Sequence, residues 1–410
     1  MPPDLPPRAD VVIVGAGPAG LAAAAALRSG GVGSVLVLDR EAEAGGIPRH
    51  CGHSPYGMRE FRRVLHGPAY AIRLAEEARK AGAEILTGVT VTALHPGPRL
   101  AVVTDAGPAE ITADQVLLAT GAREGSRAAR FLGGTKPGSI VSTGALQGLV
   151  YLAQMRPFRR PVVLGTELVS FSALLTCRHA GIRPVAMVEP GERTVARWPA
   201  PLLPRLLGMP LLLRSEIAAI EGRDRVTAVL IRSAEGERRI ETDGVIVTGL
   251  FRPEAALLQA SHIRVDPRTG GPEVDEFGRC SDPSYFAAGN LLRTIETAGW
   301  CWAEGRAVAR SMLRARSHAL PQGPGDPIDV QGDALAWVMP QRLAADHDKD
   351  AALAMLQLRA GRAARGRLAL SVGGEEIFSR AVNLLPERRL SVPLPSNVSA
   401  VRVSFSEAAD

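Results

Sequence analysis

The chain has 410 residues, of which 46% are hydrophobic, so it is long enough for two or three domains with sizeable cores. Its formal net charge is +6, but the cations are mostly scattered arginines and aromatic residues make up only 4%, which argues against a nucleic-acid surface. No apolar run is long enough to cross a bilayer and no segment resembles a signal peptide, so we expect a cytoplasmic protein without a membrane span.

Residues 8–39 indicate a dinucleotide-binding βαβ unit. An apolar strand runs into a Gly-x-Gly-x-x-Gly turn formed by Gly15, Gly17 and Gly20, an alanine-rich helix follows, and a second strand ends at Asp39. The first glycine allows the tight bend, the second lets the backbone approach a pyrophosphate, and the third lets the helix pack against the strand. The free N–H groups of the helix N-terminus attract phosphate, and the carboxylate of Asp39 accepts from ribose hydroxyls.

The next elements are predicted to complete this unit. After a glycine-rich loop at 41–58, the pattern predicts a helix and three strands, at residues 68–81, 84–94, 100–104 and 109–116. An apolar strand at 115–118 then ends in Ala119-Thr120-Gly121. This exit is a second marker of flavoproteins with two dinucleotide-binding domains, because the glycine lets the chain leave the sheet beside the FAD.

A second βαβ unit is predicted at residues 161–189. Its turn has lost two glycines, because Glu167 and Ser170 occupy the second and third glycine positions. A carboxylate repels a pyrophosphate, and a larger side chain blocks close backbone approach. We therefore expect the fold of this unit to survive while NAD(P) binding is weak or lost. The alternative is that Glu189, at the end of the second strand, still binds a ribose.

The last cofactor signal is a short strand at 285–288 that ends in Gly289. The next residue is Asn290, where flavoproteins of this kind usually carry an aspartate that hydrogen-bonds the ribitol. An amide keeps donor and acceptor capacity but removes a charge. A helix at 300–314 is expected to aim its N-terminus at the flavin ring, where the helix dipole stabilises the anionic reduced flavin.

The elements together predict the fold class. We expect an α/β, two-dinucleotide-binding-domain (Rossmann-like) flavoprotein with an inserted second βαβ domain and a small β-rich C-terminal appendage. The appendage follows a linker at 323–327, shows alternating strands between 353 and 405 and offers no catalytic constellation, so packing or subunit contact is its expected role. The expected FAD-binding domain is discontinuous and comprises residues 8–120 and 245–320. A degenerate NAD(P)-binding-like domain is expected at residues 121–244, and a small β-rich domain at residues 328–410.

The loop after the first unit carries the candidate catalytic residues. His50 or His53 is a candidate acid–base group near flavin N5, because the pKa of histidine is tunable around neutrality. Arg49 is a candidate clamp for a substrate carboxylate or a cofactor phosphate. The alternative is a loop folded over the flavin, with side chains satisfied by backbone groups. Glu296 and Thr297 either contact the flavin pyrimidine edge through their backbone or cap the next helix.

The four cysteines are Cys51, Cys177, Cys280 and Cys301, and none forms a Cys-x-x-Cys pair. This spacing argues against a zinc site, an iron–sulfur cluster held by this chain alone, or a redox-active disulfide. We expect buried free thiols in a reducing compartment, and no metal site.

Three segments resemble one family. Residues 45–61 (GGIPRHCGHSPYGMREF), 164–176 (LGTELVSFSALLT) and 288–305 (AGNLLRTIETAGWCWAEG) are similar to the FAD-binding subunits of heteromeric amine dehydrogenases. These include opine oxidase A-type subunits, dye-linked proline dehydrogenase subunits and one of the subunits of hydrogen cyanide synthase, and the resemblance covers about residues 8–315. It implies FAD, a two-dinucleotide-domain fold, oxidation at a C–N bond and a partner subunit carrying a second flavin.

One feature departs from that family. Several members carry a cysteine-rich [2Fe-2S] domain after the flavoprotein core, whereas the tail of this chain is β-rich and lacks such cysteines. Either a separate small iron–sulfur protein supplies the cluster, or this branch works without it.

We therefore predict an FAD-dependent oxidoreductase, or the FAD subunit of a heteromeric dehydrogenase, that oxidises an amine or amino acid by hydride transfer to flavin. The expected partners are that substrate, a second flavoprotein subunit and, where a cluster is used, a small iron–sulfur protein. Two alternatives are an NAD(P)H-dependent flavin reductase that passes electrons to a protein partner, and a non-catalytic scaffold that holds FAD or another adenine nucleotide. The expected cofactor-binding residues are Gly15, Gly17, Pro18, Ala19, Gly20, Asp39, Arg40, Gly46, Arg49, Val91, Ala119, Thr120, Gly121, Gly289, Asn290, Thr297 and Ala298.

Overall fold

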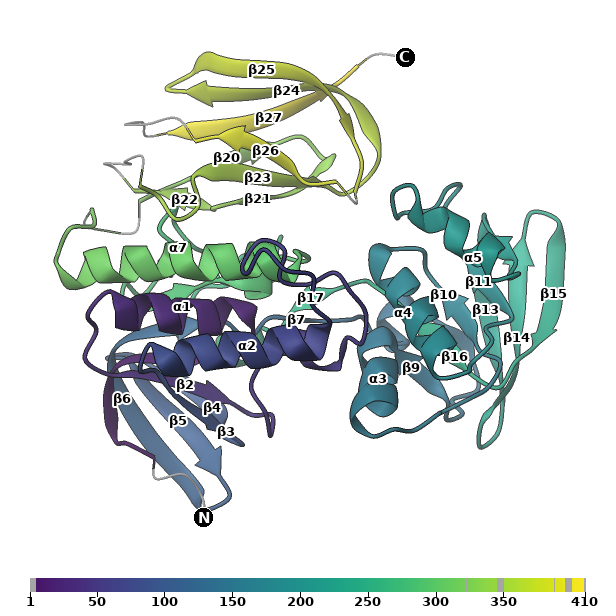
Figure 1. The fold of residues 1–410 in the computed structure, drawn as a ribbon. Coiled ribbons are helices and arrows are strands. Elements are labelled where there is room, and N and C mark those ends of the chain that lie inside the picture. Colours follow the sequence, from purple (N-terminus) through teal and green to yellow (C-terminus); the bar gives the residue numbers. More distant parts are fainter. Residues whose placement is uncertain are drawn as a thin grey trace.

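The computed structural model describes residues 5–321, 323, 325–344, 350–386, 388–394 and 400–408. These residues form three groups in Figure 1: a sheet covered by three helices, a second unit with its own sheets, and a β-rich C-terminal part beyond α7. Two of the sheets are largely parallel and are connected through helices, which confirms the predicted α/β fold class.

The first sheet has the order β3-β2-β1-β6-β5-β4, with β18 paired to the far end of β6. Its strands are β1 (Arg8–Val14), β2 (Val35–Asp39), β3 (Glu84–Thr87), β4 (Thr90–His95), β5 (Arg99–Thr104), β6 (Gly107–Leu118) and β18 (Tyr285–Ala287). One face is covered by the helices α1 (Pro18–Ser29), α2 (Gly67–Lys80) and α7 (Ala298–Arg316), as Figure 1 shows.

Strand β1 shows why this layering forms. Val11 and Ile13 pack in the core beneath the three helices, whereas Val12 and Val14 pack in the core on the opposite face, with side chains of β4 and β5. Successive side chains of a strand point to opposite faces, so an unbroken apolar run is buried on both. The strand is thus fixed at the centre of the sheet, and the turn that follows it lies at the sheet's carboxyl edge.

Strand β6 differs from the prediction of separate strands at 109–116 and 115–118. The structure has one continuous strand whose first part pairs antiparallel with β5 and whose end pairs parallel with both β1 and β18. No glycine or proline follows Pro108 within β6 to interrupt it, so the chain stays extended and changes its pairing partner instead.

Two short antiparallel strands, β7 (Ala122–Arg123) and β17 (Arg252–Pro253), connect the first unit with the second. The second unit has a parallel sheet of order β12-β11-β10-β16-β9 and a four-stranded sheet of order β15-β14-β13-β8. The strands are β8 (Gly133–Gly134), β9 (Ile140–Ser142), β10 (Val162–Leu164), β11 (Ala186–Val188), β12 (Leu211–Leu212), β13 (Ser215–Gly222), β14 (Val226–Ser233), β15 (Gly236–Glu241) and β16 (Val245–Val247). The helices are α3 (Thr143–Gln147), which continues as a π-turn to Leu152, α4 (Leu168–His179) and α5 (Leu203–Leu206), and α6 (Ala256–Gln259) follows in the return to the first unit.

The C-terminal part is a small sandwich of two sheets, with orders β20-β27-β24-β25 and β21-β23-β26. Its strands are β19 (Asp326–Pro327), β20 (Asp329–Gln331), β21 (Leu335–Met339), β22 (Arg342–Leu343), β23 (Met355–Ala360), β24 (Ala364–Val372), β25 (Glu375–Leu384), β26 (Leu390–Pro393) and β27 (Val401–Glu407). The first four were not predicted, because they are short or, in β21, apolar without alternation.

The sandwich is joined to the first sheet through shared core. Trp337, Met339 and Leu353 are buried in the same cluster as side chains of β1, β2 and β18. Their burial on the first sheet means that the C-terminal part packs directly on the first unit.

Among the residues that the structure describes, none of the helices combines the length and the apolar character that crossing a bilayer requires. All four cysteines are buried and none is in a disulfide, as the sequence predicts.

Candidate cofactor and catalytic site

The turn after β1 has the geometry of a pyrophosphate cradle. Gly15 has φ +108°, and a Cβ there would lie 2.5 Å from the carbonyl oxygen of Ala119. A Cβ at Gly20 would overlap the carbonyl oxygen of Gly15, so this glycine allows the close approach of helix α1 to the turn. At Gly17, in contrast, a Cβ would have no atom within 4 Å from any described residue beyond its chain neighbours. The middle glycine therefore faces open space at the uncapped N-terminus of α1, where a pyrophosphate fits.

Other predicted residues converge on this turn from distant parts of the chain. A Cβ at Gly46 would lie 2.9 Å from Cα of Gly17, and a Cβ at Gly289 would lie 2.9 Å from Cβ of Ala19. The Ala119–Gly121 exit meets the same edge, because β1, β6 and β18 are parallel neighbours there. In an open α/β sheet the ligand binds at this carboxyl edge, so the arrangement fits an FAD.

The carboxylate of Asp39 fixes the turn. It accepts from the backbone N–H of Ala16 at 2.7 Å and of Glu41 at 2.9 Å, which leaves lone pairs for ribose hydroxyls. Of the other predicted contacts in this region, the side chain of Arg40 is 63% exposed and Val91 is buried on β4.

Asn290 makes a reciprocal pair of bonds with one residue of its own loop. Its Nδ2 donates to the carbonyl oxygen of Glu296 at 3.1 Å, and its Oδ1 accepts from the N–H of Glu296 at 2.8 Å. An aspartate could accept but not donate, so the amide is suited to closing this loop. Thr297 is the N-cap residue of α7 but makes no side-chain cap bond, and α7 begins at Ala298, two residues before the predicted start.

The three candidate catalytic residues lie in different surroundings. The guanidinium of Arg49 donates to the carbonyl oxygen of Glu43 at 2.9 Å and to the carboxylate of Glu41 at 3.0 Å, so it braces its own loop. His53 packs against the ring of Tyr56, with ring centroids 5.5 Å apart. His50 is partly buried at the boundary with the second unit, and its Nδ1 has no hydrogen-bond partner among the described residues.

The neighbours of His50 come from α3. The next residue, Cys51, donates from Sγ to Oε1 of Gln147 at 3.3 Å, which ties the loop to the second unit. A Cβ at Gly144 would lie 4.0 Å from Cε1 of His50. Burial and the positive charge of Arg49 lower the pKa of His50 from its usual value, so the imidazole is neutral near pH 7.

Glu124 is a site residue that the sequence reasoning missed. Its carboxylate accepts from the N–H of Gly144 at 2.7 Å and of Gly249 at 3.2 Å. Glu124 thereby joins the segment after β7 to the segment before β17 and to the start of α3. Gly144 of α3 is near both Glu124 and His50. Burial raises the pKa of Glu124, although these N–H donors oppose the shift. The sequence signal was an acid placed three residues after Gly121, the end of the Thr-Gly exit of β6.

The second βαβ turn repeats the backbone of the first. Gly165 has the same φ of +108° as Gly15, and its N–H donates at 2.8 Å to Val188, as that of Gly15 does to Leu38. The two turns differ at the middle position, where Glu167 replaces the open glycine.

The side chain of Glu167 fills its own turn. The carboxylate accepts from Arg130 at 3.1 Å, from Thr248 at 3.2 Å and from Ser170 at 3.3 Å, and a Cβ at Gly165 or Gly249 would overlap it. Glu189 is 7% exposed, and its two carboxylate oxygens accept from Thr166 and from the N–H of Gly191. These residues do not fit an NAD(P) pyrophosphate. The carboxylate of Glu167 already occupies the space that a phosphate would take, and it already pairs with Arg130, the cation that a phosphate would bind.

We expect NADH to bind this second turn only weakly. In the double variant Glu167→Gly/Ser170→Gly, Arg130 is released to face a phosphate, and affinity should improve by about tenfold, or roughly 1.4 kcal/mol. Fluorescence titration with NADH measures this change. The single variant Glu167→Gln, which removes charge but not bulk, separates the two obstructions. A tight stoichiometric complex of the unaltered chain with NADH would contradict the assignment.

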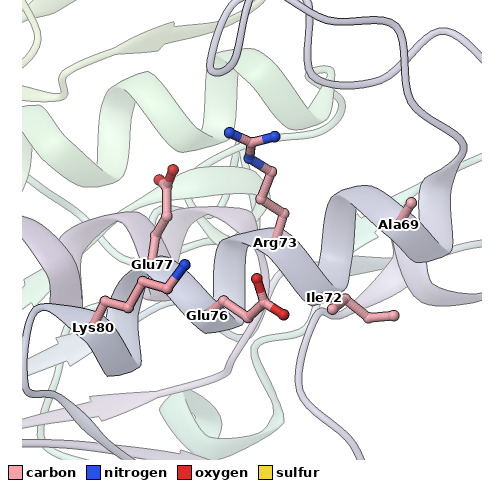
Figure 2. Close-up of a pocket in the computed structure, with 6 residues that line it drawn as sticks. All are labelled: Ala69, Ile72, Arg73, Glu76, Glu77 and Lys80. Atoms are coloured by element: carbon pink, nitrogen blue, oxygen red, sulfur yellow. The ribbon is translucent and has the colours of Figure 1, made fainter.

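A depression of about 420 Å³ on the outward face of α2 is separate from the turn. Figure 2 shows its lining, which comes from that one helix: Ala69, Ile72, Arg73, Glu76, Glu77 and Lys80. The guanidinium of Arg73 lies 4.5 Å from the centroid of the Phe61 ring.

Within the described part of the chain, no three histidine, cysteine or acidic side chains are placed to hold a metal ion.

Comparison with known proteins places this geometry in a class. The fold is that of T. acidophilum thioredoxin reductase, with a TM-score of 0.63 and 23% identity, over 76% of this chain and all of that one. Two Rossmann-like units, of which the first keeps an open glycine turn, are typical of flavoproteins of the FAD/NAD(P) type. The chain belongs to the pyridine nucleotide-disulphide oxidoreductase family, whose sequence profile matches residues 9–305. It is accordingly an FAD-dependent oxidoreductase.

The curated proteins similar to the chain include two subunits of oxidases. The alpha subunit of sarcosine oxidase from Corynebacterium sp. (strain P-1) is 29% identical over 60% of this chain and 26% of that protein. The A-type subunit of opine oxidase from Agrobacterium tumefaciens (strain Ach5) is 26% identical over 68% of this chain and 61% of that protein. The chain thus spans between about a quarter and three fifths of the length of these relatives. The predicted resemblance to opine oxidase A-type subunits is confirmed.

Proposed function

We propose that this chain is the FAD-carrying component of an enzyme that oxidises an amine or amino acid at a C–N bond. The observation that carries the proposal is the contrast between the two turns: Gly17 leaves the first open, whereas Glu167 fills the second. Because the second turn does not fit a nicotinamide dinucleotide, a flavin held at the first turn takes its electrons from another donor. The two curated relatives are named as oxidases of sarcosine and of opines, which are amines, and this supports an amine as that donor.

The chain's residues bind and orient the cofactor and accept a proton. FAD supplies the two-electron acceptor that takes a hydride from the substrate carbon. The cofactor-facing unit that we propose comprises residues 8–120 and 245–320, with contacts from the seventeen predicted residues named above. Neutral His50 is the proposed acceptor of the proton that the substrate nitrogen loses as it becomes an imine, because the residue is only partly buried and its Nδ1 has no partner among the described residues.

The proposed role of His50 predicts a pH dependence. A lowered pKa means that the imidazole is neutral above the usual value of about 6.5 and becomes protonated only as the pH falls further. The rate of flavin reduction by amine should therefore be flat on the alkaline side of this group, and should fall by about tenfold per pH unit below its pKa. Rapid-mixing absorbance measurements across pH test this. The variant His50→Gln should lose the acidic limb, and retention of the limb would exclude His50 as the base.

The proposal as a whole is tested by asking what reduces the bound flavin. Two anaerobic samples are used: the chain alone, and the chain with the product of the neighbouring gene. Each is mixed with a panel of amines and amino acids that includes sarcosine and an opine, and separately with NADH. Loss of the yellow absorbance with an amine and not with NADH supports the proposal. Rapid bleaching by NADH would favour the flavin reductase alternative, and no bleaching by any amine in the assembled complex would favour the scaffold.

A partner protein belongs to the same proposal. Both curated relatives are named as subunits, so we propose that a second flavoprotein, together with a small iron–sulfur protein where a cluster is used, completes the enzyme. Co-expression with the neighbouring gene product followed by size exclusion tests the association. An isolated monomer with full amine-oxidising activity would contradict it.

A further inference from the structure

The segment that follows β18 is held by a buried ion pair. Arg293 donates to both carboxylate oxygens of Glu304, at 2.9 and 2.6 Å, and their side chains are 2% and 8% exposed. The same pair hydrogen-bonds both backbone groups of Gly289. The N–H of Gly289 donates to Glu304 at 2.7 Å, and the carbonyl oxygen of Gly289 accepts from Arg293 at 3.1 Å. The backbone at the strand end is therefore fixed by side chains, not by sheet pairing alone.

The C-terminal sandwich completes this network. Oε1 of Gln357, on β23, accepts from Nε of Arg293 at 3.2 Å and from Arg389 at 3.3 Å. Gln357 pairs with Ser391 across the β23–β26 ladder, which places Arg389 near the same end of that strand pair. A neutral oxygen thus bridges two guanidinium groups, one from each unit.

Arg389 also compensates a buried charge next to the helix. Its guanidinium lies 3.0 Å from the carboxylate of Glu296, which is 8% exposed, and 4.7 Å from the centroid of the Trp300 ring. Glu296 is the residue whose backbone pairs with Asn290, and it immediately precedes the N-cap of α7. The sandwich therefore contacts the segment from Gly289 to Ala298 at two side chains, those of Arg293 and Glu296.

We propose that Gln357 and Arg389 are positioning residues, through which the C-terminal sandwich holds the 289–298 segment in its cofactor-facing conformation and sets the affinity and reduction potential of the FAD. The inference rests on the proposed placement of FAD against Gly289 and the N-terminus of α7. Loss of Arg389 removes the nearer of two cations beside the buried carboxylate of Glu296, because Arg359 lies 3.9 Å from the same carboxylate oxygen. The negative charge at that place is then compensated less, which disfavours the addition of electrons to a nearby flavin.

The test compares Arg389→Ala and Gln357→Leu with a control, Arg402→Ala. Arg402 lies on β27 of the same sandwich and pairs with Asp329 at 2.6 Å in an exposed ion pair. Hydrogen exchange on the cofactor-free chain should be faster in residues 289–298 of both test variants and unchanged in the control. FAD dissociation constants should rise by about tenfold in Arg389→Ala. The midpoint potential of that variant should become more negative, and Arg389→Lys, which keeps the charge, should restore most of the potential.

Two outcomes separate this inference from the proposed cofactor site. Unchanged FAD affinity and potential in Arg389→Ala, or an equal change in Arg402→Ala, would overturn the positioning role while leaving the cofactor placement intact. Retention of FAD after Gly17→Leu would instead overturn the placement on which the inference rests.

Discussion

Replacing Gly17 with leucine is expected to abolish FAD retention while leaving the fold intact. The reason is that, among the described residues other than Gly17 and its chain neighbours, no atom lies within 4 Å of the position of a Cβ at Gly17, and its φ of −82° is open to any side chain. The leucine side chain would therefore start in the open space where the pyrophosphate fits, and FAD affinity should fall by at least about 100-fold, equivalent to roughly 2.7 kcal/mol. The flavin-to-protein ratio after purification and the dissociation constant of added FAD measure the effect.

Gly148→Leu is the matched control. Gly148 begins the π-turn after α3, and a Cβ there also meets nothing within 4 Å. The same substitution at an equally open glycine outside the cofactor turn should leave FAD content unchanged. If Gly17→Leu kept as much flavin as Gly148→Leu and the unaltered chain, the first turn would not be the cofactor site.

Breaking the buried pair of Arg293 and Glu304 is expected to cause the largest loss of stability. Arg293→Met leaves the carboxylate of Glu304 buried beside Gly289 without its cation, and the loss of one partner of such a pair costs about 3–5 kcal/mol. Urea and thermal unfolding of the cofactor-free chain should show a marked shift of the transition to lower denaturant and temperature.

The compensating variant distinguishes an unpaired charge from lost packing. In Arg293→Met/Glu304→Gln the amide oxygen can still accept from Gly289, and neither member of the pair carries a charge, so most of the stability should return. Arg8→Met, which breaks an exposed pair with Asp114 at 2.7 Å, should cost less than about 1 kcal/mol. If Arg293→Met shifted the transition no more than Arg8→Met, the pair would not brace this segment.

The first unit was predictable because its signals are local. The glycine turn, the alanine-rich helix and Asp39 follow one another within a single βαβ unit, so their spacing reports their geometry directly. The blocked second turn was predictable for the same reason, since Glu167 and Ser170 stand in the positions of its own glycines. What the sequence could not show is that Arg130, from a separate segment, donates to Glu167 and helps to hold it in the turn.

The residues that were missed act across long sequence separations. Glu124 joins Gly144 to Gly249, and Arg293 joins Gly289 to Gln357 of the C-terminal sandwich. Neither relation has a spacing that periodicity can detect, because helix and strand patterns report only neighbours on one element. The role of the sandwich was hidden for this reason: its contribution lies in single side chains aimed at another unit.

A crystal structure of the chain grown with both FAD and NADH tests the central claim most directly. The account predicts that the FAD pyrophosphate lies over Gly17 at the N-terminus of α1, that the flavin ring faces the 289–298 segment, and that the ion pair of Glu167 with Arg130 still fills the second turn. An FAD absent from the first turn, or a nicotinamide dinucleotide ordered over Gly165, would contradict it.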